Sequence, residues 1–261
     1  MHILLTNDDG IRAIGLRSLY QALVAADHRV TVVAPMTEQS AVGHAVTMFS
    51  PLRLKLVEEA GFVGHGVSGT PADCVKLALA SLLDSTPDRI VSGINSGANV
   101  GVDILYSGTV SAATEGALTG IPALAVSVDD YRPTDLAHQA RFAASFLESP
   151  VWENLPERCV LNLNLPAGPF SAHKPLRVCP QTTAVYSDEY DIRIDPRGNP
   201  YYWLHGQIPR DRLGPGTDRE LLDRGHITLT PLRFDFTDHA LLDRIAAVCA
   251  PMDPVEFLSK D

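Results

Sequence analysis

The sequence has little of what membrane proteins and nucleic-acid-binding proteins need. No apolar stretch approaches the ~18 residues of a membrane span. There is no run of Lys or Arg, and the formal net charge of −10 argues against a protein that holds a nucleic-acid backbone over many phosphates. Residues 1–7 are apolar but lack the basic region of a signal peptide. We therefore expect a cytoplasmic protein with neither a membrane nor a nucleic-acid polymer among its partners.

Clustered cysteines and the two common glycine-rich nucleotide motifs are also missing. The 4 cysteines are far apart and form no CxxC or Cys/His cluster, which is typical of a reduced protein with small buried thiols. Residues 92–99 are rich in glycine, but they lack the end of a Walker loop and the GxGxxG pattern. With 45% hydrophobic and 20% charged residues over 261 positions, the chain is otherwise ordinary for a folded domain.

What the sequence does contain, up to about residue 165, is an alternation of short β-rich runs and helical patterns. The β-rich runs are apolar throughout, which indicates a parallel sheet covered on both faces. Right-handed crossovers then predict an α/β fold, a Rossmann-like three-layer sandwich with a mostly parallel sheet. The expected strands are residues 2–6, 29–35, 89–92, 123–128 and 159–164, and the expected helices are residues 15–26, 70–82, 111–119, 134–148 and 238–249.

The pattern changes after Pro166. Residues 170–235 contain many prolines and aromatics, and Arg197-Gly198-Asn199-Pro200 predicts a turn between two β-like arms. We expect a C-terminal antiparallel β-hairpin extension there. The expected organisation is a Rossmann-like core over 1–168, a β-rich extension over 169–235, and a C-terminal helix and tail over 236–261.

Two adjacent carboxylates follow the first expected strand, in Thr6-Asn7-Asp8-Asp9-Gly10. Ligands of an open parallel sheet bind beyond the carboxyl ends of its strands, so this position is a candidate site. The two carboxylates repel each other unless a cation or hydrogen-bond donors compensate. A helix cap or a solvated turn is the alternative interpretation of the pair.

Hydroxyl and amide oxygens follow two further strands. The second strand leads to Ser40 and His44, and either of these could be an ordinary loop residue. Another strand leads to Asn95, in a stretch where small residues let backbone N–H groups approach a ligand closely. Asn95 also offers a neutral oxygen that suits a hard cation.

A candidate anion site lies at Ser107-Gly108-Thr109, before an alanine-rich helix. Hydroxyls and free N–H groups converge there with the positive end of the helix dipole, although a simple helix cap would use the same residues. Two carboxylates, a hydroxyl and an amide oxygen together suit Mg²⁺ or Mn²⁺ better than zinc. A phosphate cradle beside a hard cation indicates phosphoryl chemistry.

With these motifs in order, the sequence resembles the SurE family of survival-protein nucleotidases over nearly the whole chain. The departures are small: Ala41 and Val42 follow Ser40, and Met36-Thr37 replaces a more charged pair. None of these positions is a presumed ligand, but they could alter substrate preference. The segments that carry the resemblance are ILLTNDDG (3–10), APMTEQSAVGHAVT (34–47), GTPADCVKLAL (69–79), VSGINSGANVG (91–101), YSGTVSAATEGALTGIPALAVS (106–127), GNPYYW (198–203), PGTD (215–218) and ITLTPL (227–232).

The resemblance implies an enzyme, a 5′-nucleotidase of the SurE type. It would hydrolyse nucleoside 5′- and 3′-monophosphates, sometimes with a polyphosphatase side activity. It also implies one divalent cation per subunit and a homodimer or homotetramer formed through the hairpin extension. The implied catalytic residues are Asp8, Asp9 and Asn95, the implied metal ligands are Asp8, Asp9, Ser40 and Asn95, and the implied phosphate contacts are Asn95, Ser107, Gly108 and Thr109.

Our mechanistic hypothesis is direct hydrolysis, in which the cation held by Asp8 and Asp9 lowers the pKa of a bound water. No general acid is evident, and His44 is a candidate on reactivity alone. Aspartyl-phosphate phosphatases are a rival, but they use Asp-x-Asp, whereas the carboxylates here are adjacent and their side chains diverge at a strand end. The alternative from another class is a noncatalytic nucleotide-binding sensor module, which would need the anion cradle but not the cation site.

Overall fold

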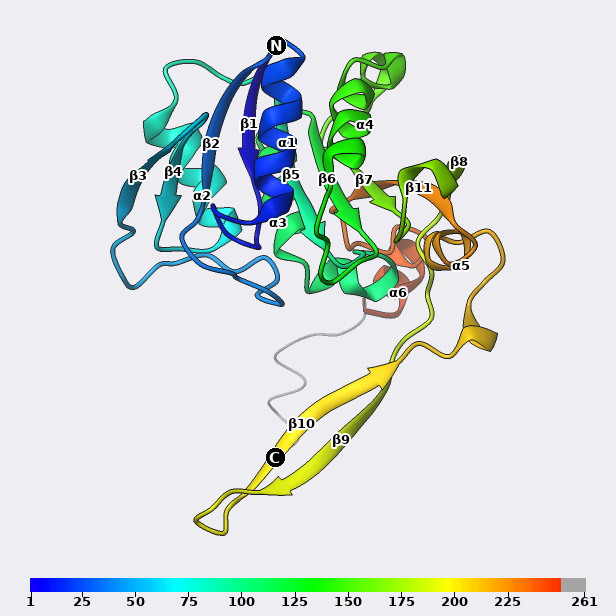
Figure 1. The fold of residues 1–261 in the computed structure, drawn as a ribbon. Helices are drawn as coiled ribbons and strands as arrows, with labels where there is room; N and C mark the ends of the chain where they lie inside the picture. The colour runs from blue at the N-terminus through cyan, green and yellow to red at the C-terminus, as the bar shows by residue number, and fades with distance from the viewer. Residues whose placement is uncertain (250–261) are drawn as a thin grey trace, which may run out of the picture.

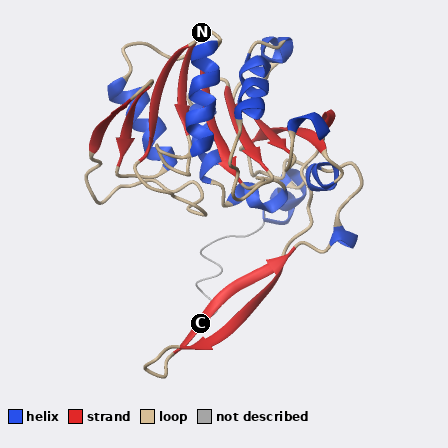
Figure 2. Cartoon of the chain, in the orientation of Figure 1, coloured by secondary structure: helices blue, strands red, loops and turns tan. Residues whose placement is uncertain are grey.

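The structure, a computed structural model, describes residues 1–249 and alternates strands with helices along most of that length (Figures 1 and 2). The strands are β1 (His2–Thr6), β2 (Arg29–Pro35), β3 (Leu54–Glu59), β4 (Phe62–Val67), β5 (Arg89–Ser96), β6 (Ala123–Val128), β7 (Cys159–Leu165), β8 (Lys174–Val178), β9 (Ser187–Ile194), β10 (Pro200–Gln207) and β11 (His226–Arg233). The α-helices are α1 (Ile14–Ala25), α2 (Pro71–Leu77), α3 (Gly108–Leu118), α4 (Ala137–Leu147), α5 (Asp218–Asp223) and α6 (Leu242–Cys249).

Nine of the strands form one sheet, in the order β3-β4-β2-β1-β5-β6-β7-β11-β8. Neighbouring strands in it are parallel except in the pairs β3–β4 and β7–β11. The mostly parallel α/β sheet predicted from the sequence is therefore confirmed. The β3–β4 hairpin was not predicted, and β5 continues past the expected end at Ser92 to Ser96, so Asn95 lies on the strand itself.

Helices cover both faces of the sheet, as the apolar strands require. Alternate residues of β1 enter different cores: Ile3 and Leu5 pack with α1 and α4, whereas Leu4 packs with α2 and α3. This alternation follows from the period of two in a strand. The three-layer sandwich is therefore confirmed, with α1 and α4 on the near face in Figure 1.

The strand order reverses direction at β1. The chain runs from β1 to β2 on one side and later returns to place β5 on the other side of β1. The loops after β1 and β5 therefore leave the sheet beside each other, which is the point where open α/β sheets bind ligands. Asp8 and Asp9 follow β1 directly, and Asn95 lies at the carboxyl end of β5.

The expected extension over 169–235 is divided between two places. Strands β8 and β11 join the edge of the large sheet, where β11 is antiparallel to β7 and parallel to β8. Only β9 and β10 leave it, as a separate antiparallel pair that projects from the body in Figure 1. The three domain boundaries stay a prediction, and the expected tail after residue 249 lies outside the described residues.

None of the helices within residues 1–249 has the length and apolar character needed to cross a membrane.

Candidate active site

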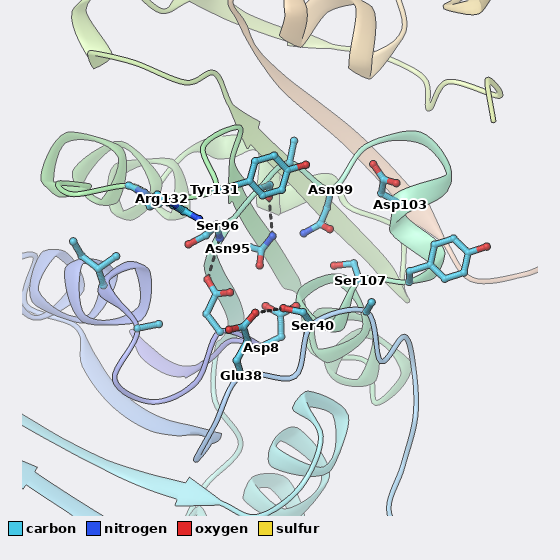
Figure 3. A pocket seen from close by; sticks show the side chains of 18 residues that line it. Asp8, Glu38, Ser40, Asn95, Ser96, Asn99, Asp103, Ser107, Tyr131 and Arg132 are labelled. Carbon is cyan, nitrogen blue, oxygen red and sulfur yellow. Dashed lines mark hydrogen bonds between the residues drawn. The ribbon is translucent and has the colours of Figure 1, made fainter. Parts of the chain in front are cut away.

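A cavity of about 550 Å³ opens at the carboxyl ends of β1 and β5 (Figure 3). The loops after β1, β2, β5 and β6 and the segment before α3 all contribute side chains to it. The polar and aromatic residues that line it are Asp8, Asp9, Glu38, Ser40, Asn95, Ser96, Asn99, Asp103, Tyr106, Ser107, Tyr131 and Arg132.

Asp8 is held by the first turn of α3. Its side chain accepts hydrogen bonds from the Thr109 backbone N–H, at 3.1 Å, and from the Thr109 hydroxyl. The positive end of the helix dipole favours a carboxylate there. A Cβ at Gly108 would lie 2.8 Å from the Asp8 Cβ, so only glycine lets the helix approach this closely.

Burial makes the Asp8 carboxylate costly to ionise. Burial raises the pKa of Asp8 to about 6; the hydrogen bonds from Thr109 oppose this increase, and the negative charge of Asp9 adds to it. Burial likewise raises the pKa of Asp9, against the hydrogen bond that the Ser96 N–H donates to it at 3.0 Å. A cation beside the pair would stabilise both charged forms.

Asn95 and Ser40 add neutral oxygens at the same cavity. The Asn95 amide nitrogen donates to the Gly97 carbonyl at 2.7 Å, so the hydrogen bond leaves the amide oxygen free for a ligand. The Ser40 hydroxyl donates to Glu38 at 2.6 Å and keeps its acceptor lone pairs. The loop after β2 carries Ser40 and is tied to the loop after β1 by a hydrogen bond. The Gln39 N–H donates to the Asp8 carbonyl at 2.8 Å.

The four predicted phosphate contacts fall into two groups. Asn95 and Ser107 line the cavity, and the Ser107 hydroxyl also caps α3 by accepting the Val110 N–H at 3.0 Å. Gly108 and Thr109 do not line it, and both donors of Thr109 are directed to Asp8. In this arrangement Thr109 acts on the site through Asp8.

His44, the candidate acid, lies in a different network. Its ring nitrogen Nε2 lies 2.8 Å from the Glu115 carboxylate on α3, and Lys76 on α2 donates to the same carboxylate at 2.7 Å. These hydrogen bonds, with His44 contributing most, lower the pKa of Glu115. His44 is not among the cavity-lining residues. Its contact with Glu115 anchors the loop that carries it to α3.

Sequence reasoning missed the cavity wall opposite the carboxylates. Tyr131 and Arg132 follow the carboxyl end of β6, and Asp103 and Tyr106 lie in the turn before α3. The rule that located Asp8 could also have identified Tyr131 and Arg132, because β6 was predicted correctly and they come directly after it. Asn99, which donates to the Ser127 hydroxyl at 2.9 Å, completes this wall.

Comparison with known proteins decides the family. The model of the family described as Survival protein SurE matches residues 3–188. The chain belongs to the SurE family. It is 63% identical over 248 residues to the 5′-nucleotidase SurE of Nitratidesulfovibrio vulgaris (strain DSM 19637 / Miyazaki F), covering 95% of this chain and 92% of that one.

Two further SurE proteins extend the comparison. The 5′-nucleotidase SurE of Solidesulfovibrio magneticus is 61% identical over 247 residues, with 95% of this chain and 97% of that one covered. The crystal structure of the SurE protein from Aquifex aeolicus superposes with a TM-score of 0.83 at 35% identity, covering 95% of this chain and 99% of that one. The resemblance drawn from the motifs is therefore confirmed, together with the fold.

The cavity of this SurE protein fits a hard divalent cation. Its charged lining consists of the four acids Asp8, Asp9, Glu38 and Asp103 and the base Arg132, so an anionic substrate meets net repulsion without a cation. No His or Cys is among the described lining residues. Within residues 1–249 there is also no group of three His, Cys, Asp or Glu suited to a metal, so hydroxyl and amide oxygens would complete the ligand set.

Proposed function

We propose that this protein is a metal-dependent phosphatase that hydrolyses nucleoside 5′- and 3′-monophosphates to nucleoside and phosphate. The chain is a 5′-nucleotidase of the SurE type, the activity named for relatives that are 60 to 63% identical to it. The observation that carries the fuller proposal is the Asp8–Asp9 pair at the sheet's switch point, beside Asn95 and the start of α3. Two carboxylates that line a cavity for an anionic substrate need a cation between them and that substrate.

We assign the cation, one Mg²⁺ or Mn²⁺ per subunit, to the oxygens of Asp8, Asp9, Ser40 and Asn95. When bound, it supplies Lewis-acid neutralisation of the phosphoryl charge and makes a bound water more acidic. Asp9, whose orientation is set by the Ser96 N–H, serves as a ligand. Asp8, which Thr109 holds, also orients the attacking water.

The phosphoryl group is held by the chain's own donors. Ser107, at the N-cap of α3, and Asn95 contact its oxygens as negative charge moves toward the leaving group. Water attacks phosphorus, the bond to the ribose oxygen breaks, and that oxygen keeps the bonding electrons and takes up the proton that the attacking water gives up. Transfer is direct, without a covalent intermediate, and detection of a phospho-aspartyl enzyme in single-turnover experiments would rule it out.

The nucleoside lies along the opposite wall of the cavity. Tyr106 and Tyr131 are 61% and 79% exposed, so each ring has exposed surface on which a base can stack. Arg132 lines the same wall and can donate to ribose or base oxygens. In this proposal the phosphate points toward Asp8 and Asp9, and the base points toward the loop after β6.

The assembly proposed is a homodimer or homotetramer built through the β9–β10 hairpin. Its cross-strand pairs Leu204–Tyr190 and Tyr202–Ile192 put four apolar side chains on one face, each at least 58% exposed. A two-stranded hairpin is marginally stable by itself, and burial of this face against another subunit would stabilise it.

The activity test compares the wild type with Asp9→Asn on a panel of 5′- and 3′-nucleoside monophosphates, with Mg²⁺, with Mn²⁺ and with chelator. We expect phosphate release that depends on the metal and falls at least about a hundredfold in Asp9→Asn, because one cation ligand loses its charge. Asp84→Asn, an exposed carboxylate outside the cavity, is the matched control and should retain wild-type rates.

Nucleotide binding without release of phosphate under any metal condition would overturn the proposal. The noncatalytic sensor module would then replace it. Release that continues undiminished in chelator, or in Asp9→Asn, would contradict the assigned role of the cation.

A further inference from the structure

Asp218 and Arg219 stand at the start of α5, in the PGTD segment whose role the proposed chemistry leaves open. Neither residue lines the cavity. Both lie more than a hundred positions after Ser107, which is the last of the predicted site residues that line it. Each nevertheless anchors a different part of the cavity wall that faces the catalytic carboxylates. The two anchors occupy consecutive positions, so one short helix holds both parts of that wall.

Asp218 holds the turn that carries Asp103 and Tyr106. Its side chain is fully buried, and its two oxygens accept the Gly101 N–H and the Thr182 N–H, each at 2.8 Å. Gly101 begins this turn with φ +55, and a Cβ there would lie 2.5 Å from the Thr182 methyl carbon. The turn thus starts at a glycine that donates to the Asp218 carboxylate and packs against Thr182, and a side chain at this position would collide with Thr182.

Arg219 holds the loop that carries Tyr131 and Arg132. Its guanidinium donates to both oxygens of Asp129, at 3.2 and 2.9 Å, and it also pairs with Asp223 on its own helix. Asp129 is the first residue after β6 and precedes Tyr131 by two positions. The side chains of Arg219 and Asp129 are 26% and 20% exposed, so this two-point contact is largely shielded from water.

The wall needs such anchors because its aromatic residues are poorly packed. Tyr131 is 79% exposed, and its ring passes over Gly97, where a Cβ would lie 2.9 Å from the ring. Figure 3 shows Tyr131, Arg132 and Asp103 around the cavity on the side away from Asp8. The placement of Tyr106 and Tyr131 depends on the backbone of the two loops, because both side chains are more than half exposed. Asp103 is also held by Tyr186, whose hydroxyl donates to it at 3.1 Å.

We propose that Asp218 and Arg219 are positioning residues for the nucleoside half of the substrate. This inference rests on the proposed function, because it takes the wall with Tyr106 and Tyr131 as the nucleoside contact. The pair sets where this wall stands relative to Asp8 and Asp9. It therefore governs binding of the nucleoside and leaves binding of the phosphate unchanged.

The test is Arg219→Met in the full-length protein, with Arg219→Lys and Asp129→Asn as further variants. Methionine keeps the apolar stem but loses both donors, and lysine keeps the charge without the two-point geometry. Arg224→Met is the matched control, because Arg224, at the C-cap of α5, pairs with Glu220 at 2.6 Å while its side chain is 68% exposed. The measurements are KM and kcat for nucleoside monophosphates, the inhibition constant of inorganic phosphate, and the melting temperature.

We expect Arg219→Met to raise KM about tenfold, because the residues that contact the nucleoside are displaced. The kcat and the inhibition constant of phosphate should stay within about twofold of the wild-type values. The KM of Arg219→Lys should lie between those of the wild type and Arg219→Met. Asp129→Asn should have the same KM as Arg219→Met, and Arg224→Met should have the wild-type KM. Unchanged KM in folded Arg219→Met and Asp129→Asn, or an equal loss of phosphate and nucleotide binding, would overturn this inference alone. A wild type that hydrolyses no nucleotide would overturn the proposed function and this inference with it.

Discussion

At the scale of single residues, Thr109 contacts Asp8, and its expected contact with phosphate stays a prediction. The sequence suggests a phosphate contact, yet its N–H and hydroxyl both donate to Asp8, and neither Gly108 nor Thr109 lines the cavity. Thr109 therefore orients a carboxylate that burial would otherwise favour in its neutral form. The N-terminus of α3 could bind the anion of a ligand, but in this structure it binds the carboxylate of Asp8.

This geometry predicts that Thr109→Val lowers kcat by about ten- to a hundredfold, because the isosteric change removes the hydroxyl donor that aligns Asp8. Activity is measured over a titration of Mg²⁺ or Mn²⁺, and more cation should be needed for half-maximal rate. Thr109→Ser, which restores the hydroxyl, should recover most of the loss. Equal rates for the valine and serine variants would show that the hydroxyl does not contribute through Asp8.

At the scale of elements, the long loop between β2 and β3 is fastened to the helices behind the cavity. Asp73, in the first turn of α2, accepts the Thr47 N–H at 2.9 Å and the Thr47 hydroxyl at 2.6 Å. The same carboxylate completes the capping box with Thr70. One buried side chain thus stabilises the start of α2 and holds a loop whose first part carries Ser40.

The Asp73 contacts predict an acid-dependent stability. Burial alone would raise the pKa of Asp73, but the hydrogen bonds from Thr47 and Thr70 outweigh it and lower the pKa. A carboxyl with a lowered pKa stabilises the fold above its unfolded pKa, ~4, and loses that contribution as the pH falls through its folded value.

We therefore expect Asp73→Asn to reduce the free energy of unfolding by about 1–3 kcal/mol at pH 7, because an ionised acceptor of several hydrogen bonds is lost. The difference from the wild type should shrink when denaturant unfolding is repeated below about pH 4. Asp84→Asn, at an exposed site, should follow the wild type at every pH. A stability difference that stays constant with pH would contradict the assignment to the Asp73 charge.

At the scale of the whole molecule, the β9–β10 hairpin stands apart from the sheet that carries the site. Its pairing register alternates two faces: Ile192 and Leu204 share the apolar face, whereas Arg193 and His205 lie on the other. The exposed apolar face is the observation that supports the proposed association between subunits. The core of one subunit supplies the cavity, and the hairpin supplies the proposed contact between subunits.

We expect the wild type to be a dimer or tetramer, and Ile192→Lys combined with Leu204→Lys to shift it to smaller species. Two buried charges without partners would cost far more than the contact contributes. Light scattering coupled to size-exclusion chromatography measures the mass. The matched control is His205→Lys on the opposite face, which should keep the wild-type mass, and a wild-type monomer would refute the assembly.

Taken alone, the sequence was enough to predict the layered α/β core and the placement of Asp8, Asp9, Asn95 and Ser107. Local patterns report strand and helix periods, and parallel strands bring their carboxyl ends to one edge whatever the intervening loops do. All four of these residues line the cavity, as expected of residues at strand ends and a helix start. Their roles as ligands and phosphate contacts remain predictions.

Only the tertiary structure decided what surrounds those residues. Thr109 meets Asp8 across 101 positions of sequence, and Gly101 meets Asp218 across 117. Likewise, β8 and β11 join the main sheet although the local pattern after Pro166 resembled a separate extension. Which groups form hydrogen bonds with a buried polar side chain depends on which segments lie next to it in the folded chain. The periodicity of the sequence reports local structure and does not show which distant segment that will be.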